Sequence, residues 1–293
     1  GYQGFLVGGA VRDLLLNVQP KDFDIATDAH PDDVRRTFRN CRLIGRRFHL
    51  AHVRFGHEII EVATFRAAHT EIDEDHGVDE VEHRAIDEHG RILRDNLYGT
   101  IEEDVWRRDF TANALYYNIE DYSIWDYVGG VEDARNRILR LIGDPATRYR
   151  EDPVRMVRAV RIAAQLDFEI EEGAREAIVQ LCGELRSSSR ERLHEEMLKI
   201  LNCGSAKAVF DRSWQKGLFQ TIYPAFSEWL QTPEGHASMP WVRKALRQFD
   251  VWKQAGLKPM PALQHALLFG PRIEAMAAAL TADDMPEFEA TLQ

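Results

Sequence analysis

A strand–diglycine–helix pattern near the N-terminus constrains the fold of this chain more than any other feature. Residues 5–7 (Phe-Leu-Val) form a short apolar run typical of a buried strand, and Gly8 and Gly9 follow as a turn. Residues 10–16 have apolar side chains at helical spacing, which predicts a helix that starts at the glycines. Such a helix presents free backbone N–H groups, which suits a phosphate. The alternative is a plain structural turn.

Two aspartates follow a short distance along the chain. Asp22 and Asp24 flank Phe23, and the two-residue period of a strand places both carboxylates on one face and the phenyl ring on the other. Neighbouring carboxylates repel each other at neutral pH, so we expect a cation between them, most simply Mg²⁺. A solvated strand end is the alternative.

Together, the motifs GGAVRD (residues 8–13) and DFD (22–24) resemble the head of the class II nucleotidyltransferases, the family of CCA-adding enzymes and bacterial poly(A) polymerases. The resemblance implies an α/β nucleotidyltransferase head with a small mixed sheet and helices, followed by an all-α neck and body. We expect the head over residues 1–134, a base-recognising neck over 135–203 and an RNA-binding body over 204–293. In the family these motifs bind the nucleotide and the metal, which here implies nucleotide binding by Gly8, Gly9 and Arg12 and Mg²⁺ binding by the catalytic residues Asp22 and Asp24.

A third carboxylate lies within an apolar run. Residues 52–55 and 58–65 are predicted to form two strands joined by a turn at Gly56 and His57. Glu61 interrupts the second strand, and a carboxylate in a central strand is costly unless it is paired or binds a metal. An edge strand that exposes Glu61 to water is the alternative. The resemblance favours a third catalytic carboxylate beside the two aspartates.

The segment RRDFTANAL (residues 107–115) is similar to a family segment assigned to the ribose and triphosphate of the incoming nucleotide. Arg108 offers a forked donor to phosphate. Asp109 can accept a hydrogen bond from a ribose hydroxyl or lie near the metal, which makes it a candidate catalytic residue. An N-capping aspartate between surface arginines is the alternative.

A helix is predicted from Asp152, with this residue at the cap and Pro153 at the first helical position. Arg155 and Arg158 lie on one side, and Met156, Val157 and Val160 face the interior. The segment matches the family motif EDxxRxxR, which reads the base. Asp152 can accept from an exocyclic amine and Arg155 can donate to the adjacent ring nitrogen, so the pair selects adenine and cytosine over guanine and uracil without choosing between them.

The rest of the chain is predicted to be helical, with buried aromatic side chains. The acidic residues 67–99 lack periodicity and are expected to form a long, mobile surface loop. The expected helices cover residues 175–182, 190–201, 206–215, 241–255 and 261–268. The aromatic side chains assigned to the core are Phe210, Trp214, Phe219, Phe226, Trp229, Trp241, Phe249 and Trp252.

Charge is distributed unevenly along the chain. The formal net charge is −11, and residues 69–104 hold 13 acidic residues against three arginines. Residues 35–54 carry seven arginines and no acid, which indicates either a solvated face or a polyanionic partner. Residues 43–53 resemble the signature that separates bacterial poly(A) polymerases from CCA-adding enzymes. We expect Arg46 and Arg47 to bind the RNA backbone there.

The expected reaction is the attack of an RNA 3′-hydroxyl on the α-phosphate of ATP, with release of pyrophosphate and two Mg²⁺ ions assisting. A CCA-adding enzyme that uses CTP and ATP is the alternative within the family. A non-catalytic RNA-binding protein is the rival from another class, and retention of the candidate carboxylates argues against it. A hydrolase of the HD type is disfavoured, since none of the 11 histidines is followed by aspartate.

The sequence also gives expectations for cellular location and oligomeric state. No apolar run approaches the roughly 20 residues that a membrane helix needs, and no signal peptide is visible. Three cysteines without CxxC spacing are typical of reduced thiols in a cytosolic protein. We therefore expect a cytoplasmic protein without a membrane partner, with a monomer favoured.

Overall fold

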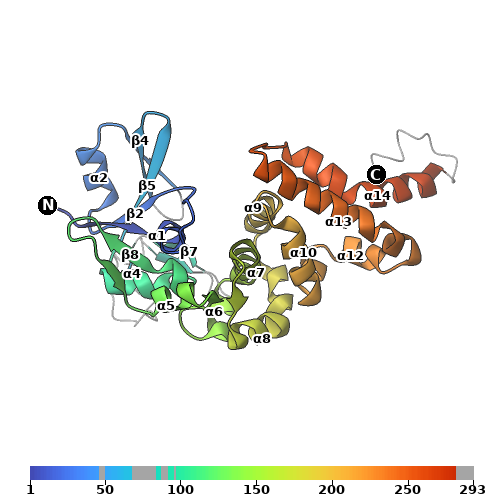
Figure 1. Ribbon diagram of the computed structural model, residues 1–293, viewed down its shortest axis with the longest axis horizontal. Helices are drawn as coiled ribbons and strands as arrows, with labels where there is room; N and C mark the ends of the chain where they lie inside the picture. The colour runs from blue at the N-terminus through green and yellow to red at the C-terminus, as the bar shows by residue number, and fades with distance from the viewer. Residues whose placement is uncertain (46–49, 68–83, 87–91, 96, 282–293) are drawn as a thin grey trace. The chain divides into compact units, whose positions relative to one another are not determined.

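The computed structural model describes residues 1–45, 50–67, 84–86, 92–95 and 97–281, which fall into two compact units (Figure 1). The first comprises Gly1–Asp152 with Glu169–Ala174, and the second comprises Pro153–Phe168 with Arg175–Gln293. A mixed sheet with helices fills the first, and helices fill the second, which confirms the predicted fold class. The division into head, neck and body stays a prediction. In the part of the chain that is described, no helix has the length and apolar character to cross a bilayer.

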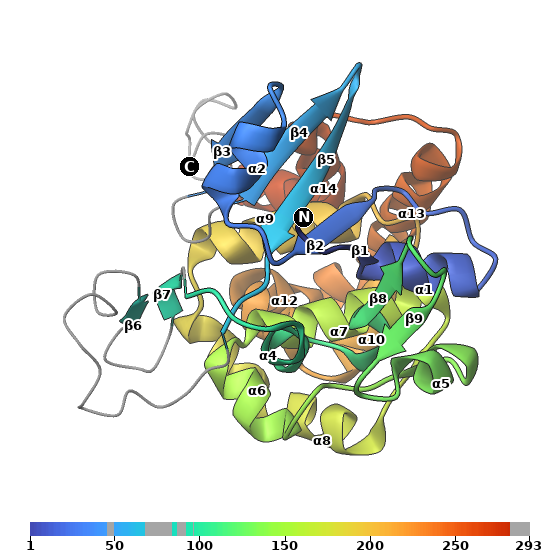
Figure 2. The same ribbon diagram turned by 90° about the vertical axis from the view of Figure 1, so that its left-hand side faces the viewer.

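Seven strands form the sheet of the first unit, in the order β3-β4-β5-β2-β1-β8-β9 (Figure 2). The β2–β5 pair is parallel and the other neighbours are antiparallel. The strands are β1 (Gly4–Val7), β2 (Asp24–Thr27), β3 (Cys41–Ile44), β4 (Leu50–Phe55), β5 (Glu58–Thr64), β8 (Leu115–Asn118) and β9 (Ile124–Asp126).

Helices cover the two faces of this sheet at different places. Helix α2 (Pro31–Thr37) packs Val34 against Val53 and Val62 on one face. Helix α4 (Ile101–Arg107) packs Val105 against Val7 and its neighbours on the other face, over β1 and β2. The remaining elements of this unit are α1 (Gly9–Leu15), η1 (Thr111–Asn113), α5 (Gly130–Arg135), α6 (Pro145–Glu151) and two small sheets, β6 (Arg84–Ile86) with β7 (Ile92–Asp95) and β10 (Ile138–Leu139) with β11 (Glu169–Ile170).

Two expectations for the first unit are wrong in part. Strand β2 begins at Asp24, so Asp22 and Phe23 precede the strand, and its two-residue period does not place their side chains. The reason is that β1 ends at Val7, the partner of Asp24, and the residues before Asp24 have no β1 residue to pair with. Within 67–99, β6 and β7 form an antiparallel pair, and the side-chain pattern does not reveal such backbone pairing. Residues 68–83, 87–91 and 96 of that stretch lie outside the described residues.

The second part of the chain is helical and has an aromatic core. Phe210, Phe226 and Phe249 are buried together, which confirms the core assignment for most of the aromatic residues. Trp241 is an exception at 48% exposed, and its indole N–H donates to the Leu267 carbonyl at 2.9 Å. The elements are α7 (Val154–Leu166), α8 (Glu172–Leu181), η2 (Cys182–Ser187), α9 (Arg190–Leu201), α10 (Ala206–Gln215), α11 (Leu218–Ile222), α12 (Pro224–Leu230), α13 (Pro233–Gln254) and α14 (Pro261–Thr281).

Helix ends account for the other corrections. Helix α7 begins at Val154 with Pro153 at its N-cap, so the predicted capping role of Asp152 is wrong. Asp152 ends α6 in an extended conformation, as expected of a residue before proline. Helix α13 starts at Pro233, well before the predicted boundary, because Thr232 caps it through the backbone N–H of Gly235 at 3.1 Å.

Candidate active site

Asp24 lies near the centre of the sheet, next to the turn at Gly8. It pairs with Val7 of β1 on one side and with Glu61 of β5 on the other. Residues that pair directly present their side chains on the same face of a sheet. The carboxylates of Asp24 and Glu61 therefore lie side by side, at the strand end where Gly8 follows Val7.

Electrostatics links these carboxylates to Asp22 and to Arg108. Partial burial raises the pKa of Asp24, and the negative charges of Glu61 and Asp22 raise it further, whereas Arg108 lowers it. Asp22 is 71% exposed, with its Oδ2 atom 3.5 Å from the Lys21 Nζ atom. Because the charges of two further carboxylates act on Asp24, the site favours a cation.

Glu61 belongs to an interior strand. Strand β5 lies between β4 and β2, so the edge-strand alternative is wrong. The Glu61 side chain nevertheless retains 49% exposure, and its Oε1 atom is 3.3 Å from the Nε2 atom of His52. Glu61 is thus both central in the sheet and accessible.

The diglycine turn is shaped by one residue in a left-handed conformation. Gly8 has a φ of 75°, which residues with a Cβ adopt at a cost, and its N–H donates to the Leu115 carbonyl at 3.3 Å. Gly9 then begins α1. Arg12 on this helix is buried, where it donates from Nε to Asp13 Oδ1 at 2.9 Å and from Nη1 to Asn113. Arg12 is thereby fixed beside the turn.

Arg108 is held by two residues that the sequence analysis missed. Its Nη2 donates to Asp104 Oδ2 at 2.9 Å, and its Nε donates to the Tyr116 hydroxyl at 2.7 Å. The Tyr116 hydroxyl in turn donates to Asp104 Oδ2 at 2.6 Å. The third nitrogen, Nη1, lies 3.9 Å from the point where a Cβ on Gly8 would stand. The guanidinium is therefore anchored on one side and faces the glycine turn with the other.

The charges around Arg108 keep it protonated. Burial by itself lowers its pKa, but Asp104 and Tyr116 outweigh this and raise it. For Tyr116, burial raises the pKa, which keeps the hydroxyl neutral. The spacing of Asp104 and Arg108, four residues apart at the end of a helix, is the signal that could have identified Asp104. The Tyr116 contact depends on the tertiary fold.

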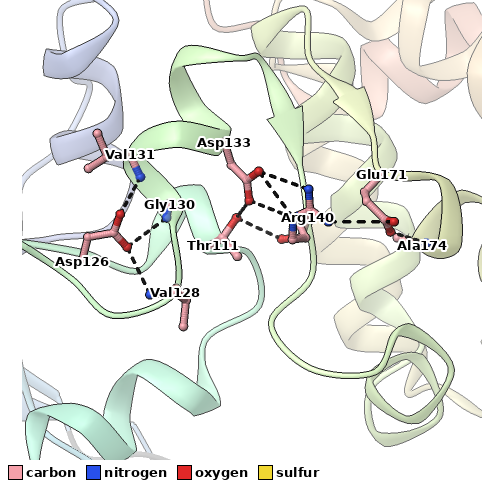
Figure 3. Close-up of polar contacts among 9 residues, drawn as sticks. All are labelled: Thr111, Asp126, Val128, Gly130, Val131, Asp133, Arg140, Glu171 and Ala174. Atoms are coloured by element: carbon pink, nitrogen blue, oxygen red, sulfur yellow. Dashed lines mark hydrogen bonds and ion pairs between the residues drawn. The ribbon is translucent and has the colours of Figure 1, made fainter.

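The segment that carries Arg108 and Asp109 is tied to α5 by a hydrogen-bond network (Figure 3). The Thr111 hydroxyl donates to Asp133 Oδ2 at 2.7 Å, and Arg140 Nε donates to the same oxygen at 3.1 Å. Asp126 accepts the backbone N–H groups of Val128, Gly130 and Val131 at 2.9–3.2 Å, which holds the start of α5.

Asp109 contacts the backbone of its own segment. Its Oδ1 accepts the backbone N–H of Phe110 at 2.9 Å, and its charge adds to the burial that raises the pKa of Tyr149. Arg148 holds the backbone of this segment, because its Nη2 atom donates to the carbonyls of Arg107 and Arg108 at 3.0 and 2.7 Å. The charged groups that shift the pKa of Asp24 are Glu61, Asp22 and Arg108.

Helix α7 presents the predicted arginines on its partly exposed side. Met156, Val157 and Val160 are buried, as predicted. Arg155 and Arg158 are partly exposed, and Arg158 Nη1 lies 3.9 Å from Oε2 of the buried Glu196. Asp152 belongs to the first unit, at the end of α6. Arg46 and Arg47, predicted to bind RNA, lie outside the described residues.

Within the described ranges, no three His, Cys, Asp or Glu side chains meet in a cluster of the metal-binding type. Mg²⁺ in proteins usually keeps several waters and takes one or two carboxylates together with substrate phosphates. The mutually repelling carboxylates of Asp22 and Asp24 fit such a site.

Two parts of the chain match domains of known proteins. Residues 4–140 match the domain described as "Poly A polymerase head domain", and residues 167–230 match "Probable RNA and SrmB- binding site of polymerase A". The chain belongs to the nucleotidyltransferase family of poly(A) polymerases and CCA-adding enzymes.

Within the family, the chain is similar to poly(A) polymerase I of Salmonella typhimurium, with 46% identity over 92% of this chain and 57% of that protein. Poly(A) polymerase I of Haemophilus influenzae is 43% identical over 92% of this chain and 58% of its own length. The CCA-adding enzyme of Bacillus licheniformis is 34% identical over 76% of this chain and 52% of its length. This chain therefore spans little more than half of these relatives.

Solved structures show the same fold. The Bacillus stearothermophilus CCA-adding enzyme in complex with CTP has a TM-score of 0.62 and 28% identity, covering 99% of this chain and 76% of that one. A tRNA nucleotidyltransferase complexed with a primer tRNA and an incoming ATP analog has a TM-score of 0.65 and 24% identity, covering 92% of this chain and 72% of that one.

Proposed function

We propose that this chain transfers AMP from ATP to RNA 3′ ends and releases pyrophosphate, as a polynucleotide adenylyltransferase. The observation that carries the proposal is the placement of Asp24 and Glu61 side by side at the strand end where the Gly8 turn and Arg108 meet. The similarity to poly(A) polymerase I of several bacteria supports the choice of reaction.

The chain's own residues provide a place for the two reacting groups. The Gly8–Gly9 turn leaves room for the triphosphate, and Arg108 and Arg12, both fixed by neighbouring polar groups, supply cationic donors for it. Asp22 and Asp24 would hold Mg²⁺, which when bound activates the attacking hydroxyl and stabilises the leaving oxygens. Glu61 is proposed to assist from the adjacent strand, and Asp109 to accept a hydrogen bond from the ribose.

Base selection is assigned to Asp152, Arg155 and Arg158. Asp152 would accept from the exocyclic amine of adenine and Arg155 would donate to the adjacent ring nitrogen. The ion pair between Arg158 and the buried Glu196 would limit the freedom of the Arg158 guanidinium. The RNA backbone would be bound by Arg46 and Arg47. We propose in addition that the protein acts in the cytoplasm as a monomer.

A CCA-adding activity is the second candidate, supported by the similarity to CCA-adding enzymes. The two are separated by supplying each of the four nucleoside triphosphates with Mg²⁺ to an oligo(A) primer and to a tRNA that lacks its CCA end. The proposal predicts a ladder of AMP additions on oligo(A). Steady incorporation of CTP on the tRNA, without growth of oligo(A), would decide for the alternative.

A further inference from the structure

The row of paired residues that contains Asp24 and Glu61 continues to the edge of the sheet. Glu61 pairs with His52 of β4, and His52 pairs with Arg42 of β3. Arg42 therefore lies on the same sheet face as the two carboxylates. Arg54 also lies on this face, since it is two residues beyond His52 on the same strand.

This part of the face is accessible, unlike the opposite one. Helix α2 covers the opposite face through Val34, Val53 and Val62. Arg42 and Arg54 are exposed, and so is Ile59, the cross-strand partner of Arg54. A ligand can therefore approach along β3 and β4 as far as Glu61.

Arg42 and Arg54 have no ion-pair partner among the described residues, whereas Arg36 on α2 pairs with Asp33. The sequence from residue 35 to residue 54 contains no acidic residue. Exposed arginines without acidic partners fit a polyanion.

The position of the two arginines relative to Asp24 favours the RNA primer over the triphosphate as their ligand. Arg108 and the Gly8 turn, proposed to hold the triphosphate, lie on the β1 side of Asp24. Arg42 lies on the other side, three strand spacings of about 4.8 Å away, or roughly 14 Å from Asp24. In phosphoryl transfer the attacking and leaving oxygens are roughly in line, so the primer must approach from the side opposite the pyrophosphate.

We propose that Arg42 and Arg54 form a track that binds the phosphate backbone of the RNA just upstream of its 3′ end. The track rests on the proposed function, because it assumes that the triphosphate occupies the Arg108 side. It reads no sequence, since contacts to the backbone position a nucleic acid without specifying it. It extends RNA binding into the sheet of the first unit.

The test is the salt dependence of RNA binding, measured by fluorescence anisotropy with labelled oligo(A) and without ATP. Each phosphate contact to single-stranded nucleic acid contributes about 0.7 to the slope of log K against log salt concentration. Arg42→Ala and Arg54→Ala are each expected to lower the slope by about 0.7 and to weaken binding several-fold at low salt. Arg42→Lys and Arg54→Lys should retain the slope. Arg36→Ala, the matched control on the opposite face, should bind like the parent.

Several outcomes would overturn the track. These are an unchanged slope in Arg42→Ala and Arg54→Ala, an equal loss in Arg36→Ala, or a raised KM for ATP with RNA binding intact. Thermal unfolding of each variant separates lost binding from lost folding, and Arg42→Gln and Arg54→Gln, which remove the charge but keep a long polar side chain, carry the test if an alanine variant unfolds. If the parent extends oligo(A) while the variants bind RNA normally, only the track fails. If the variants lose RNA binding while the parent adds no AMP, only the proposed function fails.

Discussion

The ionised Asp24 carboxylate that the proposed function needs reduces the stability of the folded protein. Its pKa is raised by partial burial and by the charges of Glu61 and Asp22, so the folded state resists its ionisation. A carboxyl whose folded pKa lies above the unfolded value costs stability at pH values above the folded pKa, and the cost disappears as pH falls toward the ordinary aspartate range. The candidate site therefore opposes folding at neutral pH, and a cation held by these carboxylates would reduce that cost.

Asp24→Asn is accordingly expected to raise the melting temperature at neutral pH in EDTA. The gain should be below about 1 kcal/mol, because solvent screens an accessible group, and it should shrink as the pH is lowered. Thermal unfolding across pH measures both effects, with Asp28→Asn, an exposed aspartate just after the same strand, as the control. A lower melting temperature for Asp24→Asn at neutral pH would contradict this account.

Tyr116 is expected to act through Arg108. Tyr116→Phe removes the hydroxyl that accepts from Arg108 and donates to Asp104, so the guanidinium loses one of its two anchors. We predict a several-fold rise in the KM for ATP, with a smaller change in kcat, and a stability loss of about 1–2 kcal/mol. Steady-state kinetics over an ATP series measures the split.

Tyr117→Phe, at the next position on the same strand, is the matched control and should leave the KM for ATP unchanged. A stability loss in Tyr116→Phe with no change in the KM for ATP would assign Tyr116 to the core alone.

At the scale of elements, the start of α5 is packed against the segment that follows Asp109. A Cβ on Gly130 would stand 2.1 Å from the carbonyl oxygen of Thr111, so the helix and this segment can approach only at a glycine. Gly130→Ala is predicted to cost about 1–3 kcal/mol or more and to displace the segment that carries Arg108. Chemical denaturation measures the loss. Gly183→Ala, where nothing lies within 4 Å, is the control, and equal effects of the two substitutions would contradict the packing account.

Elements were predictable from sequence where one local pattern decides them. Strands β4 and β5 follow from the Gly56 turn and the apolar runs on either side, and α9 and α10 have the predicted bounds. The start of β2 was not predictable, because it depends on where β1 ends and not on the Asp22–Asp24 pattern. The first and last residues of a strand are decided by its pairing with neighbouring strands.

The candidate site was predictable to the same degree. Gly8, Asp24 and Arg108 were identified from motifs, and the structure brings them together. Sequence could not place Glu61 in an interior strand, because strand order is a property of the whole sheet. The contact of Tyr116 with Arg108 depends on the β1–β8 pairing and the position of α4, which no local spacing encodes.

At the scale of the whole molecule, acidic and basic residues are concentrated in different parts of the sequence. A chain with a net charge of −11 is unsuited to RNA unless its acidic residues are segregated, and 13 of them fall within residues 69–104. Among the described arginines of this stretch, Arg35 and Arg36 lie on α2, Arg42 on β3 and Arg54 on β4. RNA binding by the whole protein should therefore weaken steeply with salt despite its negative net charge.

The central claim is that the Asp24 carboxylate, beside the Gly8 turn and Arg108, supports nucleotide transfer to RNA. Its most direct test is incorporation of labelled AMP into an oligo(A) primer by the parent, by Asp24→Asn and by the Asp28→Asn control, with Mg²⁺ present. The account predicts primer growth with the parent and the control, and a loss of at least about a hundredfold with Asp24→Asn. Equal incorporation by Asp24→Asn and the parent would contradict it.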